Sequence, residues 1–472
     1  MPDPAVQPNS RSLLTPSHLV KLFLISALLA LTASSSLPTD VQRAPSHALP
    51  DTSSTRIARD IQPLVDAHPG LSGFHILSDG VDAFATRLRI IRAADKSIVA
   101  QYYLWHTDLT GNAMYYQLLH AADRGVRVRI LLDDLDTAGK DDMLHLIDAH
   151  PNVEVRLYNP FANRDRRAGD FVTDTRRINR RMHTKTLTVD NQVTVFGGRN
   201  IGDEYFAAAK DVGFNDMDAL AIGPIVPEVS SQFDLFWNSE WVYPISAFPR
   251  DEPVTEEEIK AFRQLSDEQI SEAKNSEYAD VIRQLDTLAQ TSFTELELSW
   301  SDWLLAYDPP SNVEAEEITA EEHLAPKLKE GMVRTKDELN IVSPYFVPRK
   351  SGVEFFSALQ ASGVQVTIVT NSLAANNQVT VHGGYAPSRK SLLRSGVRIY
   401  EVRPDAEVAG SQIVAASGAK STLHTKAFLV DGHKVFIGSF NFDPRSANLN
   451  TESGVIIESE HMAERFFAGI DE

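Results

Sequence analysis

The chain has 472 residues, of which 43% are apolar and 23% are charged, values that are typical of a folded globular protein. This composition excludes a chain that is mainly disordered, collagen-like or a coiled-coil rod. The 64 acidic residues exceed the 45 basic residues by 19, which argues against general nucleic-acid binding, because such binding depends on neutralising phosphates. The sequence contains no cysteine, so disulfides and thiol nucleophiles are excluded as well.

The first element along the chain is an apolar run at residues 22–33, preceded by Lys21 and followed by small residues. This run is shorter than the roughly 20 residues of a membrane span and matches the hydrophobic core of a signal peptide. We therefore predict that residues 1–55 form a signal peptide, or alternatively a retained membrane anchor, together with a linker rich in Pro, Ser and Thr. Either outcome directs the protein to the cell envelope.

The rest of the chain contains a duplicated unit. Residues 97–105 alternate in the manner of a strand, a helical stretch ends at Gly125, and a second strand follows. The same order recurs with Gly363 in the place of Gly125. We predict an α/β fold with two halves related by a pseudo-twofold axis, residues 56–250 and 331–472, each a mostly parallel β-sheet flanked by helices.

An acidic segment, residues 251–330, separates the two halves and interrupts the repeat. Its runs of Glu and one helical-looking stretch predict a solvated, mostly helical connector. Trp300, Trp303 and Leu304 could instead form a lid or face a membrane, although aromatic residues at helical spacing more often belong to a core.

Each half also contains the pattern H-x-K-x-x-x-x-D, followed after six residues by G-x-x-N. The two sets are His183, Lys185, Asp190, Gly197 and Asn200, and His424, Lys426, Asp431, Gly438 and Asn441. Because strand residues two apart share a face, the imidazole and the ammonium of each half should point to the same side. The Asp lies at the turn with the opposite parity, where it would fix the turn or pair with a base.

Pooling the two halves gives a set of groups that suits a phosphodiester. Lys and Asn side chains can bind the non-bridging oxygens and offset developing charge. One neutral imidazole can attack phosphorus while a protonated one donates to the leaving oxygen. We predict that the catalytic set consists of the His, Lys and Asp residues of both motifs, and that no metal or other cofactor is required.

With these two motifs the chain resembles the phospholipase D superfamily. The stretches FGGRNIGDEYF and FIGSFNFDPRSANLNTE resemble bacterial cardiolipin synthases of the C type. The resemblance covers about residues 75–460. It implies phosphatidyl transfer through a phosphohistidine on His183, with phosphatidylglycerol as acceptor and phosphatidylethanolamine as donor. It also implies work at a membrane surface of a bacterial cell envelope, exported or anchored in the inner membrane and facing the periplasm, without nucleic acid as a partner.

Three other functions stay open from the sequence: a phospholipase D that hydrolyses phospholipids, a nuclease, and a lipid-binding protein without catalysis.

The same resemblance implies that Asn200, Asn441 and Ser439 bind phosphate. Gly198 departs from the pattern, because this position usually carries Ser.

Several further residues are candidates for supporting roles. Glu452 is predicted to orient the ring of His424, and Asp218 is predicted to do the same in the first half. The arginines before His183, Arg176 and Arg177 among them, form either a rim that attracts anions or a loop paired with nearby aspartates. The acidic run LLDDLD is interpreted as the loop at a strand end rather than as a cation site.

Overall fold

The computed structural model describes residues 36–273, 275, 278–280, 293–313, 323–405 and 420–471. The apolar run at residues 22–33, predicted to be a signal or anchor, lies outside these residues. In the part of the chain that is described, none of the helices has both the length and the apolar character needed to cross a membrane.

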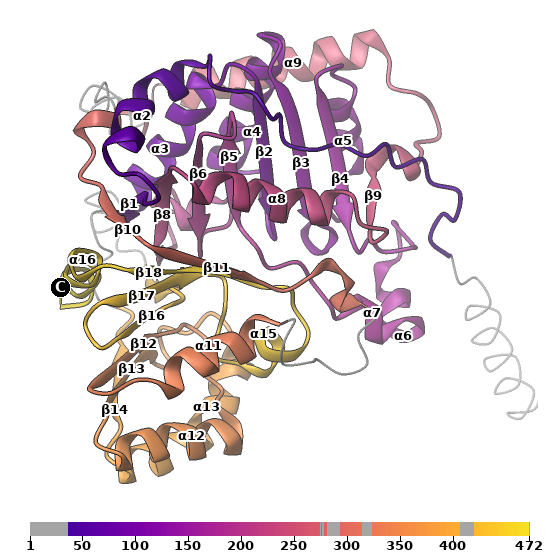
Figure 1. Cartoon of the computed structure of the whole chain (residues 1–472). Coiled ribbons are helices and arrows are strands. Elements are labelled where there is room, and N and C mark those ends of the chain that lie inside the picture. Colours follow the sequence, from indigo (N-terminus) through magenta and orange to yellow (C-terminus); the bar gives the residue numbers. More distant parts are fainter. Residues whose placement is uncertain are drawn as a thin grey trace, which may run out of the picture.

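The first half is built on a sheet with the strand order β10-β1-β8-β6-β5-β2-β3-β4-β9 (Figure 1). Its strands are β1 (Ser72–Leu77), β2 (Ser97–Tyr102), β3 (Arg127–Asp133), β4 (Val153–Tyr158), β5 (Thr186–Val189), β6 (Val193–Gly197), β8 (Asp218–Ile222), β9 (Val242–Pro244) and β10 (Ser299–Ser301). Parallel pairing joins β2, β3 and β4, whereas the remaining strands pair in antiparallel fashion.

The second half repeats this plan in a sheet with the order β11-β18-β17-β16-β12-β13-β14. Its strands are β11 (Trp303–Tyr307), β12 (Glu338–Val342), β13 (Gln365–Asn371), β14 (Arg398–Val402), β16 (Ala427–Val430), β17 (Lys434–Gly438) and β18 (Ser453–Glu458). Again three neighbouring strands, β12, β13 and β14, are parallel. The α/β fold with two related halves is confirmed, and the parallel part of each sheet is confined to three strands because the motif hairpins, β5–β6 and β16–β17, add antiparallel ones.

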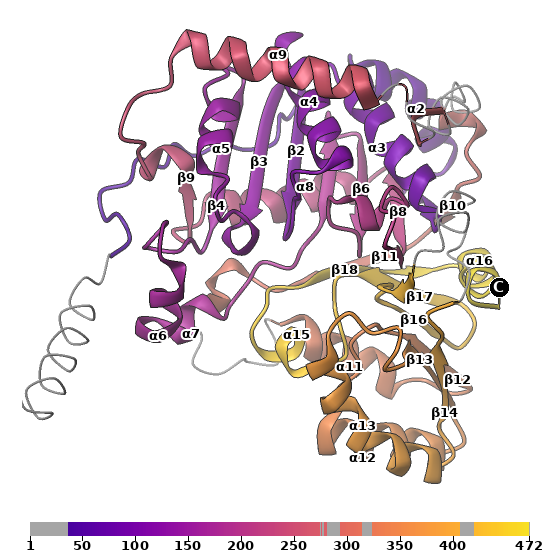
Figure 2. The ribbon, with the colours of Figure 1, turned by 180° about the vertical axis from the view of Figure 1, so that it is seen from behind.

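Helices cover both faces of the first sheet and also pack against the second (Figure 1 and Figure 2). In the first half they are α2 (Arg56–Ala67), α3 (Gly80–Ala93), α4 (Leu109–Asp123), α5 (Asp141–Asp148), α6 (Asp170–Thr173), α7 (Thr175–Ile178), α8 (Ile225–Trp237) and α9 (Glu256–Ala273). In the second half they are α11 (Leu324–Val333), α12 (Arg349–Ala361), α13 (Val379–Arg394), α15 (Pro444–Asn448) and α16 (Glu460–Asp471). Figure 1 shows α8 across one face of the first sheet, and Figure 2 shows α3, α4 and α5 on the other.

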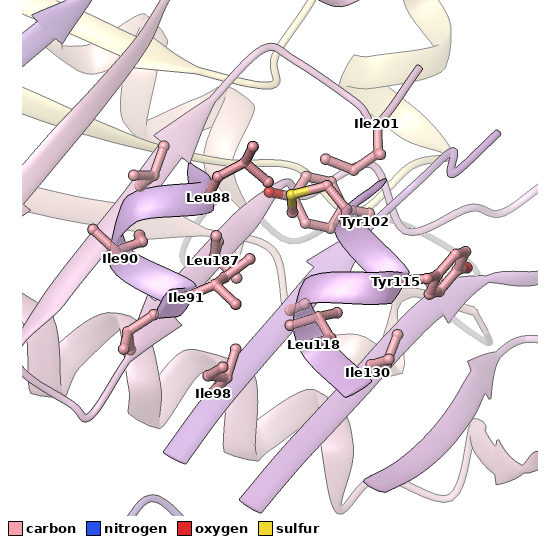
Figure 3. Packing of buried hydrophobic residues seen from close by; sticks show 14 of the residues in the cluster. Leu88, Ile90, Ile91, Ile98, Tyr102, Tyr115, Leu118, Ile130, Leu187 and Ile201 are labelled. Carbon is pink, nitrogen blue, oxygen red and sulfur yellow. The ribbon is translucent and has the colours of Figure 1, made fainter. Parts of the chain in front are cut away.

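The core of the first half follows from strand alternation. Ile98 faces α3 and α4, whereas its neighbour Val99 faces Phe233 of α8, since successive strand side chains point to opposite faces. Figure 3 shows the α3 and α4 side of this core, formed by Leu88, Ile91, Leu118, Ile98, Ile130 and Leu187.

The acidic connector contributes strands as well as helix. Beyond α9, residues 299–301 form β10, which pairs with β1, and residues 303–307 form β11, which pairs with β18. The prediction of a mostly helical connector is wrong for this stretch, because its aromatic residues find partners at the edges of both sheets. Trp300 stacks on His68 with a ring distance of 4.1 Å, while Leu304 remains 55% exposed.

The two halves share an apolar core and exchange backbone hydrogen bonds. Residues on one face of β1 and β8 pack with residues of β16, β17 and β18 in a single buried cluster. In addition, β15 (Lys420–Leu423) of the second half pairs in parallel with β7 (Val212–Asn215) of the first, and Met182 forms a bridge with Thr451. The segments that lead into both motifs therefore cross to the opposite half.

Candidate active site

Each motif histidine is anchored by backbone from the other half. The amide of His183 donates to the carbonyl of Thr451 at 2.8 Å, and the amide of His424 donates to the carbonyl of Asn215 at 2.7 Å. These two bonds follow directly from the strand exchange that precedes each motif. They bring both imidazoles to the boundary between the halves, where neither half alone would form the site.

Each imidazole also receives a carboxylate from the opposite half. Nδ1 of His183 lies 2.8 Å from Oε2 of Glu452, and Nδ1 of His424 lies 2.5 Å from Oδ2 of Asp216. Burial raises the pKa of both carboxyl groups, but the neighbouring His and Lys side chains outweigh it and hold both pKa values below their usual range. The ionised carboxylates only accept hydrogen bonds, so each Nδ1 donates and each Nε2 keeps its lone pair.

Both imidazoles are neutral near pH 7. Burial is the main cause that lowers the pKa of His183 to about 4 and that of His424 to about 3. The nearby ammonium groups lower the pKa values further, against the opposing effect of the carboxylates. A neutral ring whose Nε2 carries a lone pair is the form that can act as a nucleophile.

Two buried lysines supply the positive charge of the site. The ammonium groups of Lys185 and Lys426 donate to the carbonyls of His183 and His424, respectively. The Lys426 Nζ lies 2.9 Å from Nδ1 and 3.2 Å from Nε2 of His424. Burial lowers the pKa of Lys185 well below its usual value and that of Lys426 to about 8, although the acidic neighbours counteract this effect. Two ammonium groups balance two carboxylates, and the charge of an added phosphate would favour protonation of the imidazoles.

The predicted phosphate-binding asparagines differ in whether their side-chain oxygens already have hydrogen-bond partners. Asn200 is engaged, since its Oδ1 accepts from the amide of Leu104 at 3.2 Å and its Nδ2 donates to the Tyr205 hydroxyl at 2.8 Å. By contrast, the buried Oδ1 of Asn441 has no hydrogen-bond partner among the described residues.

Ser439 has a different role from the one predicted. Its hydroxyl donates to Oε2 of Glu452 at 2.5 Å, so it positions the carboxylate that holds His183, and its single proton is already used. The departure at Gly198 has a steric reason, because a Cβ there would lie 2.1 Å from Oδ1 of Asp216. The first half therefore uses that space for the carboxylate itself.

Two predictions about orienting carboxylates are wrong. Glu452 contacts His183 and not His424, because the segments before the motifs cross between the halves. Asp218 accepts hydrogen bonds from the buried Arg87 at 2.8 Å and Arg199 at 3.3 Å instead of contacting His183. Asp216, which the sequence analysis did not select, holds His424.

The sequence does contain a signal for Asp216. The strand registers pair Gly197 with Asp218 and Gly438 with Gly454, so Asp218 corresponds to Gly454. Asp216 lies two residues before Asp218, and Glu452 lies two residues before Gly454, so Asp216 corresponds to Glu452. Aligning the first apolar residues of the two strands, Ala219 of β8 and Val455 of β18, gives the same match in the sequence.

The motif aspartates, predicted as part of the catalytic set, lie at the hairpin turns with no contact to the imidazoles. Asp190 accepts from the backbone amides of residues 95, 96 and 97, and Asp431 does so from residues 336, 337 and 338. Both have a left-handed φ, 52° and 51°. They fix the turns and the starts of β2 and β12, as their opposite strand parity indicated, and the catalytic assignment is wrong for them.

Aromatic rings that the sequence analysis did not select pack around the histidines. Tyr103 lies edge-on to His183 at 4.8 Å, and Tyr205 lies edge-on to His424 at 5.1 Å. Phe214 stacks on His424 with ring planes only 7° apart. These rings keep both imidazoles out of water and contribute to their low pKa values.

The arginines before His183 are largely bound to aspartates. Arg164 pairs with Asp134 and Asp141, and Arg177 pairs with Asp174 at 2.5 Å. These contacts favour the paired loop over the anion-attracting rim. The run LLDDLD ends β3 as expected, and Asp133 and Asp134 are occupied by protein donors: Leu135, Phe161, Arg164, Arg167, Arg181 and Met182.

Only one group of side chains in the described residues has the spacing of metal ligands. It consists of His106, Asp108 and Glu204, whose ligand atoms lie within 4.8 Å of one another. The group contains neither motif histidine. In addition, the carboxylate of Asp108 accepts hydrogen bonds from the amides of Gly111 and Asp203.

Two interlocked α/β halves that bring paired H-x-K motifs together at their boundary define an enzyme of the phospholipase D superfamily. The sequence matches the family described as "Cardiolipin synthase, PLD-like domain" over residues 88–237 and 328–471. The chain therefore belongs to this cardiolipin synthase family of phospholipase D-like proteins.

Three known proteins are similar to this chain over most of its length. Cardiolipin synthase C of Escherichia coli K12 is 42% identical over 415 residues, which is 87% of this chain and 86% of that protein. An uncharacterized protein of Helicobacter pylori is 32% identical over 403 residues, 84% of this chain and 78% of that protein. The crystal structure of phosphatidylserine synthase from Haemophilus influenzae shares the fold, with a TM-score of 0.56 at 15% identity over 88% of this chain and 89% of that one.

The crossed carboxylates can be tested with a matched pair of variants. We predict that Asp216→Asn changes the His424 tautomer, as seen in long-range ¹H–¹⁵N NMR couplings, because the amide no longer fixes the proton on Nδ1. Phosphodiester turnover should fall by about 100-fold. Asp218→Asn is the control, since this residue bonds to Arg87 and Arg199, and it should leave the tautomer unchanged. The opposite pattern would contradict the assignment.

Proposed function

We propose that this enzyme makes cardiolipin by transferring a phosphatidyl group from phosphatidylethanolamine to phosphatidylglycerol through a covalent phosphohistidine. The observation that carries the proposal is the pair of neutral imidazoles, each oriented by a carboxylate from the opposite half and accompanied by a buried ammonium. The 42% identity to a protein named cardiolipin synthase C supports the choice of product.

In the first step, Nε2 of His183 attacks the phosphorus of the donor lipid. The bond between phosphorus and the headgroup oxygen breaks, and His424, protonated when the anionic phosphate is bound, gives its Nε2 proton to that oxygen. Ethanolamine leaves with this proton, and the phosphatidyl group remains on His183. Glu452 stabilises the positive charge on the His183 ring during the attack, because its carboxylate is already hydrogen-bonded to Nδ1.

In the second step, a hydroxyl of phosphatidylglycerol replaces ethanolamine in the same position. His424, now neutral, takes the hydroxyl proton, the oxygen attacks phosphorus, and the bond to His183 breaks. Lys185 and Lys426 offset the charge on the non-bridging oxygens in both steps, and Asn441 can donate from its amide nitrogen. None of these steps requires a metal or another cofactor. Exclusion of water decides between transfer and hydrolysis.

The substrates also suggest where the enzyme works. We propose that it acts at the membrane surface of the bacterial envelope and that it faces the periplasm, because the apolar run at residues 22–33 has the length of an export signal. Phospholipids and the membrane surface are then its partners, and nucleic acid is not.

The product is the direct test of the proposed function. We expect the purified full chain in mixed micelles to form cardiolipin from phosphatidylglycerol, and more of it when phosphatidylethanolamine is added, as measured by lipid mass spectrometry. His183→Ala and His424→Ala should each abolish the product, since nucleophile and acid are both needed. His120→Ala on α4 is the matched control and should keep full activity.

Two outcomes would contradict the scheme. If phosphatidic acid is the product under every lipid mixture, the enzyme is a hydrolase. If rapid quenching traps the phosphatidyl group on a peptide that contains His424 and not His183, the roles of the two histidines are reversed.

The low pKa of Lys426 predicts an alkaline limit. As the pH rises through about 8, the ammonium of the substrate-free enzyme loses its proton and no longer attracts the phosphate. We therefore expect kcat/KM to fall by about tenfold per pH unit above that value, while kcat falls only at higher pH because the bound phosphate holds the proton. Lys420→Ala, at an exposed lysine of β15, should keep the wild-type profile. A kcat/KM that stays constant to about pH 10 would exclude this role for Lys426.

The location can be tested separately. A reporter that is active only in the periplasm should be active when fused after Glu472. A protein that fractionates entirely with the cytosol would exclude the envelope assignment.

A further inference from the structure

A cavity of 270 Å³ lies in the second half, between α11, α12 and α15 and directly behind the loop that carries Ser439 and Asn441. Ser439 faces the histidine site through Glu452, whereas its neighbours Phe440 and Phe442 line the cavity. Further along the wall are Phe355, Phe356 and Met332. The cavity and the proposed active site therefore share one loop as a common wall.

The repeat provides an internal comparison for this cavity. The amide of Val347 donates to the carbonyl of Phe442 at 2.7 Å, and in the first half the amide of His106 makes the same bond to Ile201 at 2.9 Å. This correspondence has the offset of 241 residues that also separates the two motif histidines.

The same offset relates the residues that fill this place in each half. Trp105 and Tyr115 correspond to Phe346 and Phe356. In the first half the two large rings stack at 4.4 Å, and they are 2% and 3% exposed. In the second half the two rings lie 5.7 Å apart, and Phe356 lines the cavity. Tyr115 on α4 lines a cavity of only 40 Å³, whereas Phe356 at the equivalent place on α12 lines one of 270 Å³, so the two halves differ in the size of this space.

The rim of the cavity is positively charged. Lys329 of α11 and Arg349 of α12 line it, both are exposed, and neither forms an ion pair with a carboxylate in the described parts of the chain. The acid in the lining, Asp443, is already used, because its carboxylate accepts from the amides of Arg445 and Ser446. Two exposed cations beside an apolar cavity are notable in a chain with a net charge of −19.

The backbone at the rim is also unusual. Arg349 has a φ of 52°, in the left-handed region that costs energy for a residue with a Cβ. Such conformations persist where the surrounding structure enforces them and are concentrated at ligand sites. Here the conformation occurs at the first residue of α12, where the guanidinium lines the cavity.

We propose that this cavity binds one acyl chain of an anionic phospholipid, with its phosphate at Lys329 and Arg349. The apolar wall matches the hydrocarbon chain, and the two cations match the negative headgroup. The inference rests on the proposed function for its choice of lipid, and it adds an acyl-chain site next to the catalytic loop.

Photolabelling tests the site without the need for turnover. The full chain is mixed with micelles of a phosphatidylglycerol that carries a diazirine at the end of one acyl chain, and the labelled peptides are identified by mass spectrometry. We expect the label on peptides of α11 and α12 that contain Met332 and Phe355. Phosphatidylcholine with the same chain should label them several-fold less, because it lacks the net charge.

Matched variants test whether the labelling comes from lipid that is bound in the cavity. Ala325→Trp fills it, and labelling at subsaturating lipid should fall by about tenfold, since two lost buried methylene groups already cost that much affinity. Ala358→Trp, on the exposed side of α12, is the control and should label like wild type. The double variant Lys329→Glu and Arg349→Glu should remove the preference for phosphatidylglycerol, whereas the exposed neighbour Lys350→Glu should keep it.

The outcomes separate this inference from the proposed function. Labelling that Ala325→Trp leaves unchanged, or that falls outside the cavity walls, would overturn the site even if cardiolipin is formed. Labelling that Ala325→Trp abolishes supports the site even if the product is phosphatidic acid, in which case only the proposed function fails. Hydrolysis of a small soluble phosphodiester should survive in Ala325→Trp, and its loss would mean that the variant damages the catalytic loop.

Discussion

The exchange of backbone between the two halves is the interaction on which the rest of the site depends. Because the residues before each motif pair with the opposite half, His183 lies against Glu452 and His424 lies against Asp216. A carboxylate from one half thus orients an imidazole from the other. The site forms only when both halves dock, so the shared apolar core between the sheets stabilises the fold and the chemistry together.

Burial makes this arrangement effective. The enclosing rings and the shared core remove water from two imidazoles, two ammonium groups and two carboxylates, which strengthens every interaction among them. The same burial keeps both imidazoles neutral before the substrate binds. The two signs of charge balance within the site, and an incoming phosphodiester anion then shifts the balance toward a protonated imidazole, as general acid catalysis requires.

The two halves share the same backbone arrangement but differ in the side chains at equivalent positions. Gly198 and Ser439 occupy equivalent positions, yet one makes room for Asp216 and the other supports Glu452 through its hydroxyl. The cavity with a positively charged rim beside Phe356 measures 270 Å³, whereas the one beside Tyr115 in the first half measures 40 Å³. A pseudo-symmetric site that handles a donor and an acceptor in turn benefits from such differences, because its two sides meet different groups of the lipids.

The sequence by itself determined the duplication, the α/β class and the motif histidines and lysines, because strand periodicity and a repeated spacing are local properties of the chain. The turn role of Asp190 and Asp431 followed from strand parity in the same way. The tertiary structure alone decided which carboxylate serves which imidazole, since Glu452 and His183 are 269 residues apart and meet only through the exchange between halves. It also decided that residues 299–307 become edge strands of two sheets, because pairing partners outside the segment select the conformation of so short a stretch.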